Sequence, residues 1–276
     1  MIDVLKYEGE KVVVTGVASG MGEETARLLS KLGAEVYGLD INKPEIEIDH
    51  FIPVNLNDKS SIDDAVEKLP EKISSIFNCA GVAGSTYANK SFSRLDVITI
   101  NFIGPRHLIE SLVPKMKKEG AIAILSSING LGWTANKERL LPLLNTSSFD
   151  EAQEWYKENE KTFMEPYDET PIPEYTVSKE LVTSWVKKRA YELSEQNIRL
   201  NSVSPSAVNT TMMDSFNELT GMDVMATSRS KIDRESERED NAKVLIFLNS
   251  DLASYVSGQD IVVDYGFSGH GIHGLI

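Results

Sequence analysis

The chain has 276 residues, of which 41% are hydrophobic, which is enough for a sizeable core in one large α/β domain or two small ones. Its formal net charge of −14 at pH 7 argues against nucleic acid and anionic membrane surfaces as partners. The single cysteine, Cys79, excludes an intrachain disulfide. The sequence shows neither a signal-peptide pattern nor an apolar run near the ~20 residues that a membrane helix needs, so we expect a cytoplasmic protein.

Strand-like and helix-like segments alternate along the first part of the chain. The expected strands are 11–15, 35–39, 51–54 and 74–78, and the expected helices are 21–32 and 60–69. This alternation predicts a parallel sheet with helices on both faces.

The first strand leads directly into a glycine-rich turn, Thr15–Gly22, that opens the first helix. Glycines let the backbone turn sharply and approach a pyrophosphate, and the helix N-terminus points unpaired N–H groups at the negative charge. Asp40 follows the second strand, about twenty residues on, where a carboxylate accepts the hydroxyls of an adenosine ribose. It would repel a 2′-phosphate, and neither Ser19 nor Ile41 is basic. The turn therefore predicts NAD rather than NADP.

The rest of the chain continues the pattern. The remaining expected elements are helices at 95–118, 174–196 and 236–249 and strands at 121–125, 198–203 and 260–264. Within the first of these helices, Asn101 is either a satisfied core amide or the anchor of a water molecule, and a kink at Pro105 that frees a carbonyl would favour the water. The densely charged run 231–240 is expected to be a solvated loop and the start of a helix.

Tyr175 and Lys179 are four residues apart on one expected helix and so share a face. An ammonium beside a phenol stabilises the phenolate and lowers the pKa of the tyrosine, which suits proton transfer near neutral pH. This pair is the candidate acid–base centre.

Several other segments lie at the carboxyl ends of expected strands, where open α/β sheets bind ligands. Asn55-Leu56 is either an ordinary loop or an adenine contact, and the small residues of Asn78–Gly81 permit close approach of a cofactor. Ser126 and Ser127 end the apolar strand at 121–125, a place where two serines are commonly just a loop start.

These segments together resemble the short-chain dehydrogenase/reductase family over nearly the whole chain. The matches, in order, are Thr15–Gly22, Asn78-Cys79-Ala80-Gly81, Asn101, Ser127, Tyr175-x-x-x-Lys179 and Pro205–Thr211. Cys79 stands where the family usually has a second Asn, and Ser206 stands where it usually has Gly, so we expect these two residues to tune cofactor binding without abolishing it. The resemblance implies one Rossmann domain over 1–276, with a doubly wound parallel sheet of about seven strands.

The resemblance also implies a hydride-transfer site with catalytic residues Asn101, Ser127, Tyr175 and Lys179. Tyr175 would be the acid or base, Lys179 would lower its pKa and hold the nicotinamide ribose, and Ser127 would hydrogen-bond the substrate oxygen. Asn101 would hold a water that links Lys179 to solvent. No metal is needed, because the NAD cofactor supplies or takes the hydride.

The cofactor residues that the resemblance implies extend from the turn to the end of the sheet. Besides Tyr175 and Lys179 they are Gly16, Ser19, Gly20, Met21, Gly22, Asp40, Asn55, Leu56, Asn78, Ala80, Gly81, Pro205, Val208 and Thr210.

The gap between Ser127 and Tyr175 is 48 residues, about 35 more than is common in the family. We expect the segment 131–174 to be an inserted, partly helical piece at the mouth of the site, with a helix over 149–163. Such an insertion is similar to that of the 3α-hydroxysteroid dehydrogenase/carbonyl reductase branch. A second loop, 207–235, is expected to bind substrate. The candidate substrate contacts are Ser127, Leu131, Trp133, Met212 and Met213.

The first hypothesis is an NAD(H)-dependent oxidoreductase that interconverts a secondary alcohol and a ketone on a bulky apolar substrate, with a hydroxysteroid or bile acid first. The alternatives are an aromatic alcohol dehydrogenase of the coniferyl type and a general carbonyl reductase. A non-catalytic NAD-binding protein is disfavoured because Ser127, Tyr175 and Lys179 are all present. Since oligomers are common in the family, a homodimer or homotetramer is expected.

Overall fold

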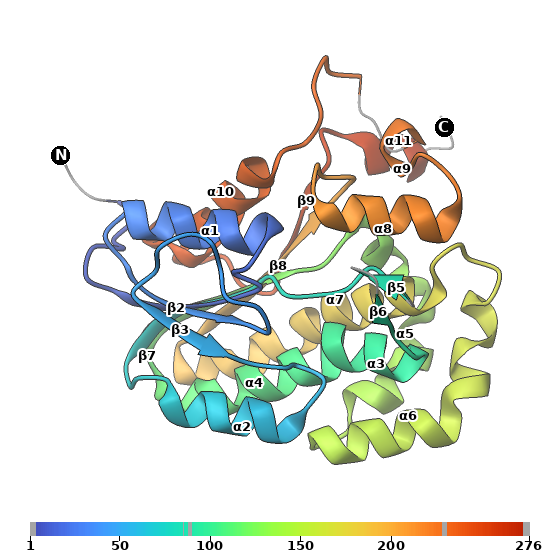
Figure 1. The fold of residues 1–276 in the computed structure, drawn as a ribbon. Coiled ribbons are helices and arrows are strands. Elements are labelled where there is room, and N and C mark those ends of the chain that lie inside the picture. Colours follow the sequence, from blue (N-terminus) through green and yellow to red (C-terminus); the bar gives the residue numbers. More distant parts are fainter. Residues whose placement is uncertain (1–3, 85, 88–89, 228–230, 273–276) are drawn as a thin grey trace.

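The computed structural model describes residues 1–276 except 1–3, 85, 88–89, 228–230 and 273–276. Its centre is a seven-stranded sheet with the order β3-β2-β1-β4-β7-β8-β9, and every pairing in that sheet is parallel (Figure 1). The strands are β1 Lys11–Thr15, β2 Glu35–Asp40, β3 His50–Pro53, β4 Ile73–Asn78, β7 Met116–Leu125, β8 Arg199–Pro205 and β9 Asp260–Val263. The chain starts in the middle, winds to the β3 edge and returns to wind to the β9 edge, so the predicted doubly wound fold is confirmed.

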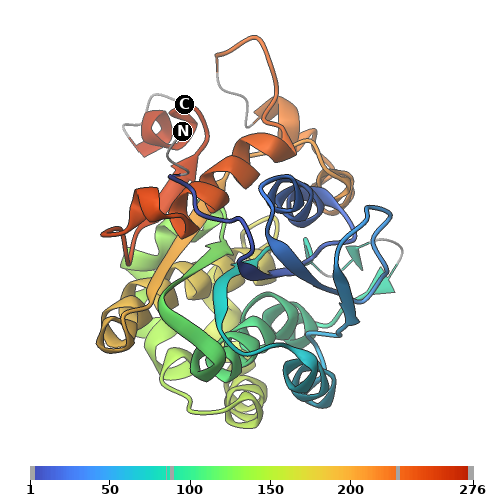
Figure 2. The same cartoon turned by 90° about the vertical axis from the view of Figure 1, so that its left-hand side faces the viewer.

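Helices cover both faces of the sheet (Figures 1 and 2). They are α1 Gly20–Lys31, α2 Lys59–Lys68, α3 Arg94–Ile98, α4 Gly104–Leu112, α5 Trp133–Leu144, α6 Phe149–Met164, α7 Pro173–Leu193, α8 Thr211–Thr220, α9 Val224–Thr227, α10 Arg238–Asn249 and α11 Phe267–Ile272. A short antiparallel ribbon, β5 Thr86–Tyr87 and β6 Lys90–Ser91, lies outside the main sheet.

The side chains of each central strand alternate between two apolar cores. In β1, Val13 belongs to the core under α2, α4 and α7, whereas Val12 and Val14 belong to the core under α1 and α10. All three side chains are fully buried. A strand buried on both faces needs an uninterrupted apolar run, which explains the Val12-Val13-Val14 sequence.

The prediction of one long helix over 95–118 is wrong in two respects. The segment is broken into α3, a π-helical turn Thr99–Ile103, α4, and a 3₁₀ turn Val113–Lys115, and β7 already begins at Met116. Pro105 has no N–H to give to the preceding turn, and Pro114 has none near the end of the segment, so neither position supports a continuous α-helix. The irregular turn lies at Asn101, one turn before Pro105.

The inserted segment forms two helices on the α7 side of the sheet (Figure 1). The predicted helix over 149–163 is confirmed as α6, whereas α5 was not predicted. Two buried ionisable side chains attach the insertion to the domain. Arg106 of α4 donates to the carbonyl of Leu143 and to Thr146, and Glu180 of α7 accepts from Tyr167 Oη at 2.5 Å and from Asn136 Nδ2 at 3.0 Å.

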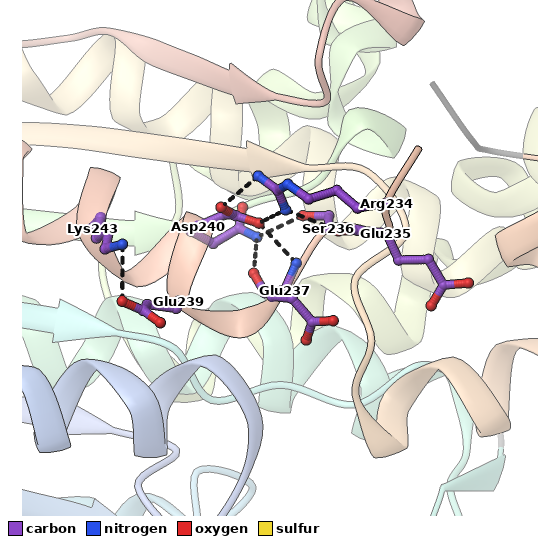
Figure 3. Close-up of polar contacts among 8 residues, drawn as sticks. Arg234, Glu235, Ser236, Glu237, Glu239, Asp240 and Lys243 are labelled. Carbon is purple, nitrogen blue, oxygen red and sulfur yellow. Dashed lines mark hydrogen bonds and ion pairs between the residues drawn. The ribbon is translucent and has the colours of Figure 1, made fainter. Parts of the chain in front are cut away.

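The charged run 231–240 is a loop followed by the start of α10, as predicted. Glu237 and Asp240 form a capping box, and Nη1 and Nη2 of Arg234 donate to the Asp240 carboxylate (Figure 3). Across the described parts of the chain, no helix has both the length and the apolar character needed to cross a membrane.

Candidate active site

A groove of about 360 Å³ runs along the carboxyl ends of β1, β2, β3 and β4. The residues predicted to bind a cofactor that line it are Gly16, Ser19, Gly20, Met21, Asp40, Asn55, Leu56, Ala80, Gly81 and Thr210. Segments far apart in sequence therefore meet where parallel strands end.

Two glycines of the turn, Gly16 and Gly22, leave no room for a side chain. Gly16 and Gly20 have φ of +77° and +64°, and a Cβ on Gly16 would lie 2.8 Å from the backbone nitrogen of Ala80. A Cβ on Gly22 would overlap the carbonyl oxygen of Gly16. Gly22 is buried behind the groove, so it packs the helix against the turn instead of lining the groove.

Thr15 joins the ends of β1 and β4. Its Oγ1 donates to Asn78 Oδ1 at 3.0 Å and accepts from the backbone N–H groups of Cys79 and Ala80 at 3.1 Å each. Asn78 is buried and is not among the groove-lining residues, so it supports the groove from behind. Thr15 was predicted only as part of the turn, and its side-chain role was missed because its partners lie more than sixty residues away.

At the other end of the groove, the Asp40 carboxylate joins the glycine-rich turn to the loop after β2. Oδ2 accepts from the backbone N–H of Ala18 and Oδ1 from that of Asn42, each at 3.0 Å. No lysine or arginine is among the described residues that line the groove. Each carboxylate oxygen retains a further lone pair with which to accept a ligand hydroxyl.

Asn101 acts as a clasp between three segments. Its Nδ2 donates to Val82 O at 3.0 Å and to Ser178 Oγ at 3.1 Å, and its Oδ1 accepts from Val82 N at 2.8 Å. The amide is thus engaged with protein groups on both of its atoms. It ties the π-helical turn and α7 to the loop after β4, which fixes Gly81 beside the groove.

Tyr175 and Lys179 lie on the inner side of α7, both buried. Lys179 Nζ is 5.4 Å from the centre of the Tyr175 ring and donates to the carbonyl of Leu125 at 2.9 Å. A Cβ added to Gly81 would lie 3.9 Å from Lys179 Nζ. Because Gly81 lines the groove, the Lys179 amine lies directly behind the groove wall. Ser127 hydrogen-bonds the Tyr175 side chain and accepts from the backbone N–H of Asn129.

Burial controls the protonation of both groups. It raises the pKa of Tyr175 to about 12, against a smaller opposing effect of the hydrogen bond from Ser127. Burial lowers the pKa of Lys179 to about 8. Lys179 was expected to lower the pKa of Tyr175, but the resolved lowering comes from Ser127, and the burial of the phenol outweighs it.

The two serines after β7 have different partners. Ser126 Oγ is engaged with the carbonyl of Lys179 and with Thr183 Oγ1, at 3.1 and 2.7 Å. That hydroxyl helps to attach α7 to the sheet. Ser127 is the serine whose hydroxyl meets Tyr175.

A smaller cavity of about 80 Å³ adjoins Tyr175 and Ser127. The predicted residues Pro205, Val208, Thr210, Met212 and Met213 also line it, together with Met21. Leu131 and Trp133 are not among the residues that line it. Trp133 packs instead against the main apolar core.

Phe216 of α8 was missed in the sequence analysis. Its ring contacts the Tyr175 ring edge-on, with centroids 4.8 Å apart and planes at 74°. Ile172 and Val224 complete the apolar wall. A helical reading of residues 211–220 would have found Phe216, since it lies four residues after Met212 on the same face.

Comparison with known proteins gives matches over nearly the whole chain. The family described as short chain dehydrogenase matches residues 10–137, and the family described as enoyl-(acyl carrier protein) reductase matches residues 168–268. A coniferyl-alcohol dehydrogenase of a Pseudomonas species is 31% identical over 268 residues, covering 96% of this chain and 98% of that protein. The 3-alpha-hydroxysteroid dehydrogenase/carbonyl reductase of Comamonas testosteroni is 27% identical, covering 92% and 95%.

Solved structures share the fold. A 3-alpha-hydroxysteroid dehydrogenase from Pseudomonas sp. B-0831, complexed with NADH, has a TM-score of 0.73 at 22% identity and covers 97% of this chain and all of that one. The aldohexose dehydrogenase of Thermoplasma acidophilum has the same TM-score at 19% identity, covering 96% of each chain.

Proposed function

The chain belongs to the short-chain dehydrogenase/reductase family, whose members are NAD(P)-dependent oxidoreductases that act on CH–OH groups, and from this premise we propose that it is an NAD-dependent dehydrogenase of aromatic alcohols of the coniferyl type. The observation that carries the proposal is the cavity of about 80 Å³ between Ser127, Tyr175 and Phe216. The coniferyl-alcohol dehydrogenase relative supports the same substrate class.

The groove fits an NAD molecule in its shape and its charge. The absence of a Cβ at Gly20, where only the Thr210 methyl would come within 4 Å, leaves the turn open to close approach of a diphosphate, and the N-terminus of α1 faces that turn. Asp40 would accept the hydroxyls of the adenosine ribose, and no cationic side chain among the described groove residues would favour a 2′-phosphate. When bound, the cofactor supplies the hydride acceptor.

The residues around Tyr175 would handle the substrate hydroxyl. Ser127 Oγ would hydrogen-bond the substrate oxygen, and Tyr175 Oη would take its proton. Lys179 is mostly protonated at pH 7, because its pKa is about 8, and it therefore presents a positive charge 5.4 Å from the Tyr175 ring. That charge favours the phenolate, which the burial of Tyr175 opposes.

The size of the cavity favours a slender substrate. Ligand pockets of drug-sized molecules usually measure at least ~300 Å³, so any ring-bearing substrate must displace α8 from its position over Tyr175. One aromatic ring requires the smallest displacement, and it can make edge-to-face contact with Phe216 or Tyr175. A four-ring steroid, our first expectation from the sequence, requires a much larger one. We keep 207–235 as the substrate-binding loop, because Met212, Met213, Phe216 and Val224 all line this cavity.

The proposal is tested by following NADH at 340 nm with purified protein and a panel of coniferyl, cinnamyl and benzyl alcohols, cyclohexanol and 3α-hydroxysteroids. We expect turnover of the phenylpropenoid alcohols with NAD, and at least ~10-fold lower kcat/KM with NADP. Preferential oxidation of a steroid would contradict the proposed substrate, and a preference for NADP would contradict the role of Asp40. Tyr175→Phe should abolish turnover but still bind NADH.

We further propose a homo-oligomer built on the β9 edge. Within the described part of the chain, β9 is the last strand of the sheet and its one partner strand is β8. The nearby turn after α10 exposes Leu252 and Tyr255, with Tyr255 fully accessible. Large exposed apolar side chains at an unpaired sheet edge suit an interface with a second copy. Tyr255→Asp should lower the molar mass measured by light scattering. Because the dinucleotide that the proposed activity requires is a cytoplasmic metabolite, we also propose a cytoplasmic location.

A further inference from the structure

The glycine-rich turn contains no positively charged side chain. It offers backbone N–H groups and the N-terminus of α1, and the described residues along the groove include no lysine or arginine. Glu23, in the first turn of α1, places a carboxylate immediately after it. A carboxylate at this position stabilises the helix dipole, but it repels a diphosphate bound at the same helix end.

Arg238, which is 215 residues after Glu23 in the sequence, contacts this end of α1. It is the first residue of α10, and its Nη1 donates to Glu23 Oε2 at 3.0 Å. The Arg238 side chain is 46% exposed and that of Glu23 is 22% exposed, so the guanidinium is free to take a second acceptor from the solvent side. Guanidinium presents five N–H donors, and this ion pair uses one of them.

Arg238 also faces the turn itself. It lines a polar cavity of about 410 Å³ together with Ser19, Gly20, Thr210 and Thr211. These four residues also line the cofactor groove, so the two spaces adjoin there. Among the described residues that line this polar cavity, Arg238 is the one cation, and it is accompanied by the carboxylates of Asp214 and Glu235.

We propose that Arg238 is a cofactor-positioning residue, whose guanidinium is shared between the Glu23 carboxylate and the diphosphate of the bound dinucleotide. The inference rests on the proposed use of NAD, and it assigns the diphosphate a cationic partner from α10. Guanidinium groups bind phosphate oxygens through charge-assisted hydrogen bonds, and an arginine already oriented by Glu23 loses less side-chain entropy on binding.

Lys243 provides a matched control on the same helix. It pairs with Glu239 at 2.9 Å, as Figure 3 shows, and like Arg238 it forms an exposed ion pair. Lys243 is not among the residues that line either space at the turn. Lys243→Ala therefore removes one positive charge and one ion pair from α10 without removing a group that faces the turn.

The test is the dissociation constant of NADH, measured by fluorescence titration of the full-length protein. We expect Arg238→Ala to weaken binding by ~10-fold, with a smaller dependence of affinity on salt, and Lys243→Ala to stay within ~2-fold of wild type. Glu23→Gln should tighten NADH binding, because the Arg238 guanidinium then binds the diphosphate without competition from a carboxylate. The double variant Glu23→Gln/Arg238→Ala should bind as weakly as Arg238→Ala.

Two results would overturn the inference while leaving the proposed function intact. In one, Arg238→Ala binds NADH as wild type does. In the other, the double variant regains wild-type affinity, which would mean that Arg238 only neutralises Glu23. A wild-type protein that does not bind NADH at all would overturn this inference and the proposed function together. Urea unfolding of each variant confirms that differences in affinity do not come from lost structure.

Discussion

Lys179 should destabilise the chain in the absence of cofactor, and its replacement by methionine tests this directly. Burial lowers the pKa of Lys179 to about 8, below the ~10.4 of an unfolded lysine. Each pKa unit corresponds to ~1.4 kcal/mol, so carrying the charge into the folded state costs about 3 kcal/mol at pH 6 to 7. Methionine fills a similar volume without the charge.

The pH dependence separates this cost from the hydrogen bond to Leu125, which the neutral amine also makes. The folded state releases its proton near pH 8 and the unfolded state only above pH 10, so wild-type stability rises with pH between these values. At pH 9.5 the cost falls to about 1.3 kcal/mol. The stability of Lys179→Met relative to wild type should therefore drop by about 2 kcal/mol between pH 6 and pH 9.5.

The assay is urea unfolding of cofactor-free protein at both pH values. Lys137→Met, at an exposed position on α5, corrects for the change in formal charge. A difference between Lys179→Met and wild type that stays constant with pH would refute the reasoning, because it would show that burial does not shift the protonation of Lys179. The variant should also lose turnover, so its gain in stability would show that the site is destabilised for function.

Three further substitutions test residues that support the site and the inserted segment. Gly22→Ala should lower the melting temperature by at least ~4 °C, since its methyl would overlap the Gly16 carbonyl; an unchanged melting temperature would contradict so close an approach. Asn101→Ala should lower the free energy of unfolding by ~2–4 kcal/mol, since it leaves the buried backbone of Val82 without its partners; a loss below ~1 kcal/mol would show that the clasp is dispensable. Burial raises the pKa of Glu180, so wild type should lose stability as the pH rises above the ~4.3 of an unfolded glutamate, and Glu180→Gln should not. Parallel urea curves at pH 4.5 and 7 for the two proteins would argue against a buried, proton-retaining Glu180.

The order of the elements and most of the strands could be read from the sequence, because both depend on local patterns. Val12-Val13-Val14 predicts a strand buried on both faces wherever it lies, and the glycines of Thr15–Gly22 predict a tight turn before a helix. The prediction of one long helix over 95–118 was wrong because the spacing of apolar residues does not determine which backbone hydrogen bonds form. Pro105 signalled an irregularity, but its form as a π-helical turn depends on the clasp that Asn101 makes with distant segments.

In the candidate site, too, some features follow from the local sequence and others only from the fold. Residue type and spacing sufficed to select Tyr175, Lys179 and Asp40, since the chemistry of a phenol beside an amine, or of an acid after a strand, belongs to the residues themselves. The balance of their pKa values did not follow from spacing, because burial is a property of the whole fold.

What the sequence determined by itself was the family, the parallel sheet and the acid–base pair, because each rests on short-range pattern and on the chemistry of single side chains. Only the tertiary structure placed Phe216 over Tyr175 and Arg238 beside Glu23. The partners in these contacts are 41 and 215 residues apart. No local preference encodes such contacts, since they arise only when the packing of α8 and α10 on the sheet brings those helices to the groove.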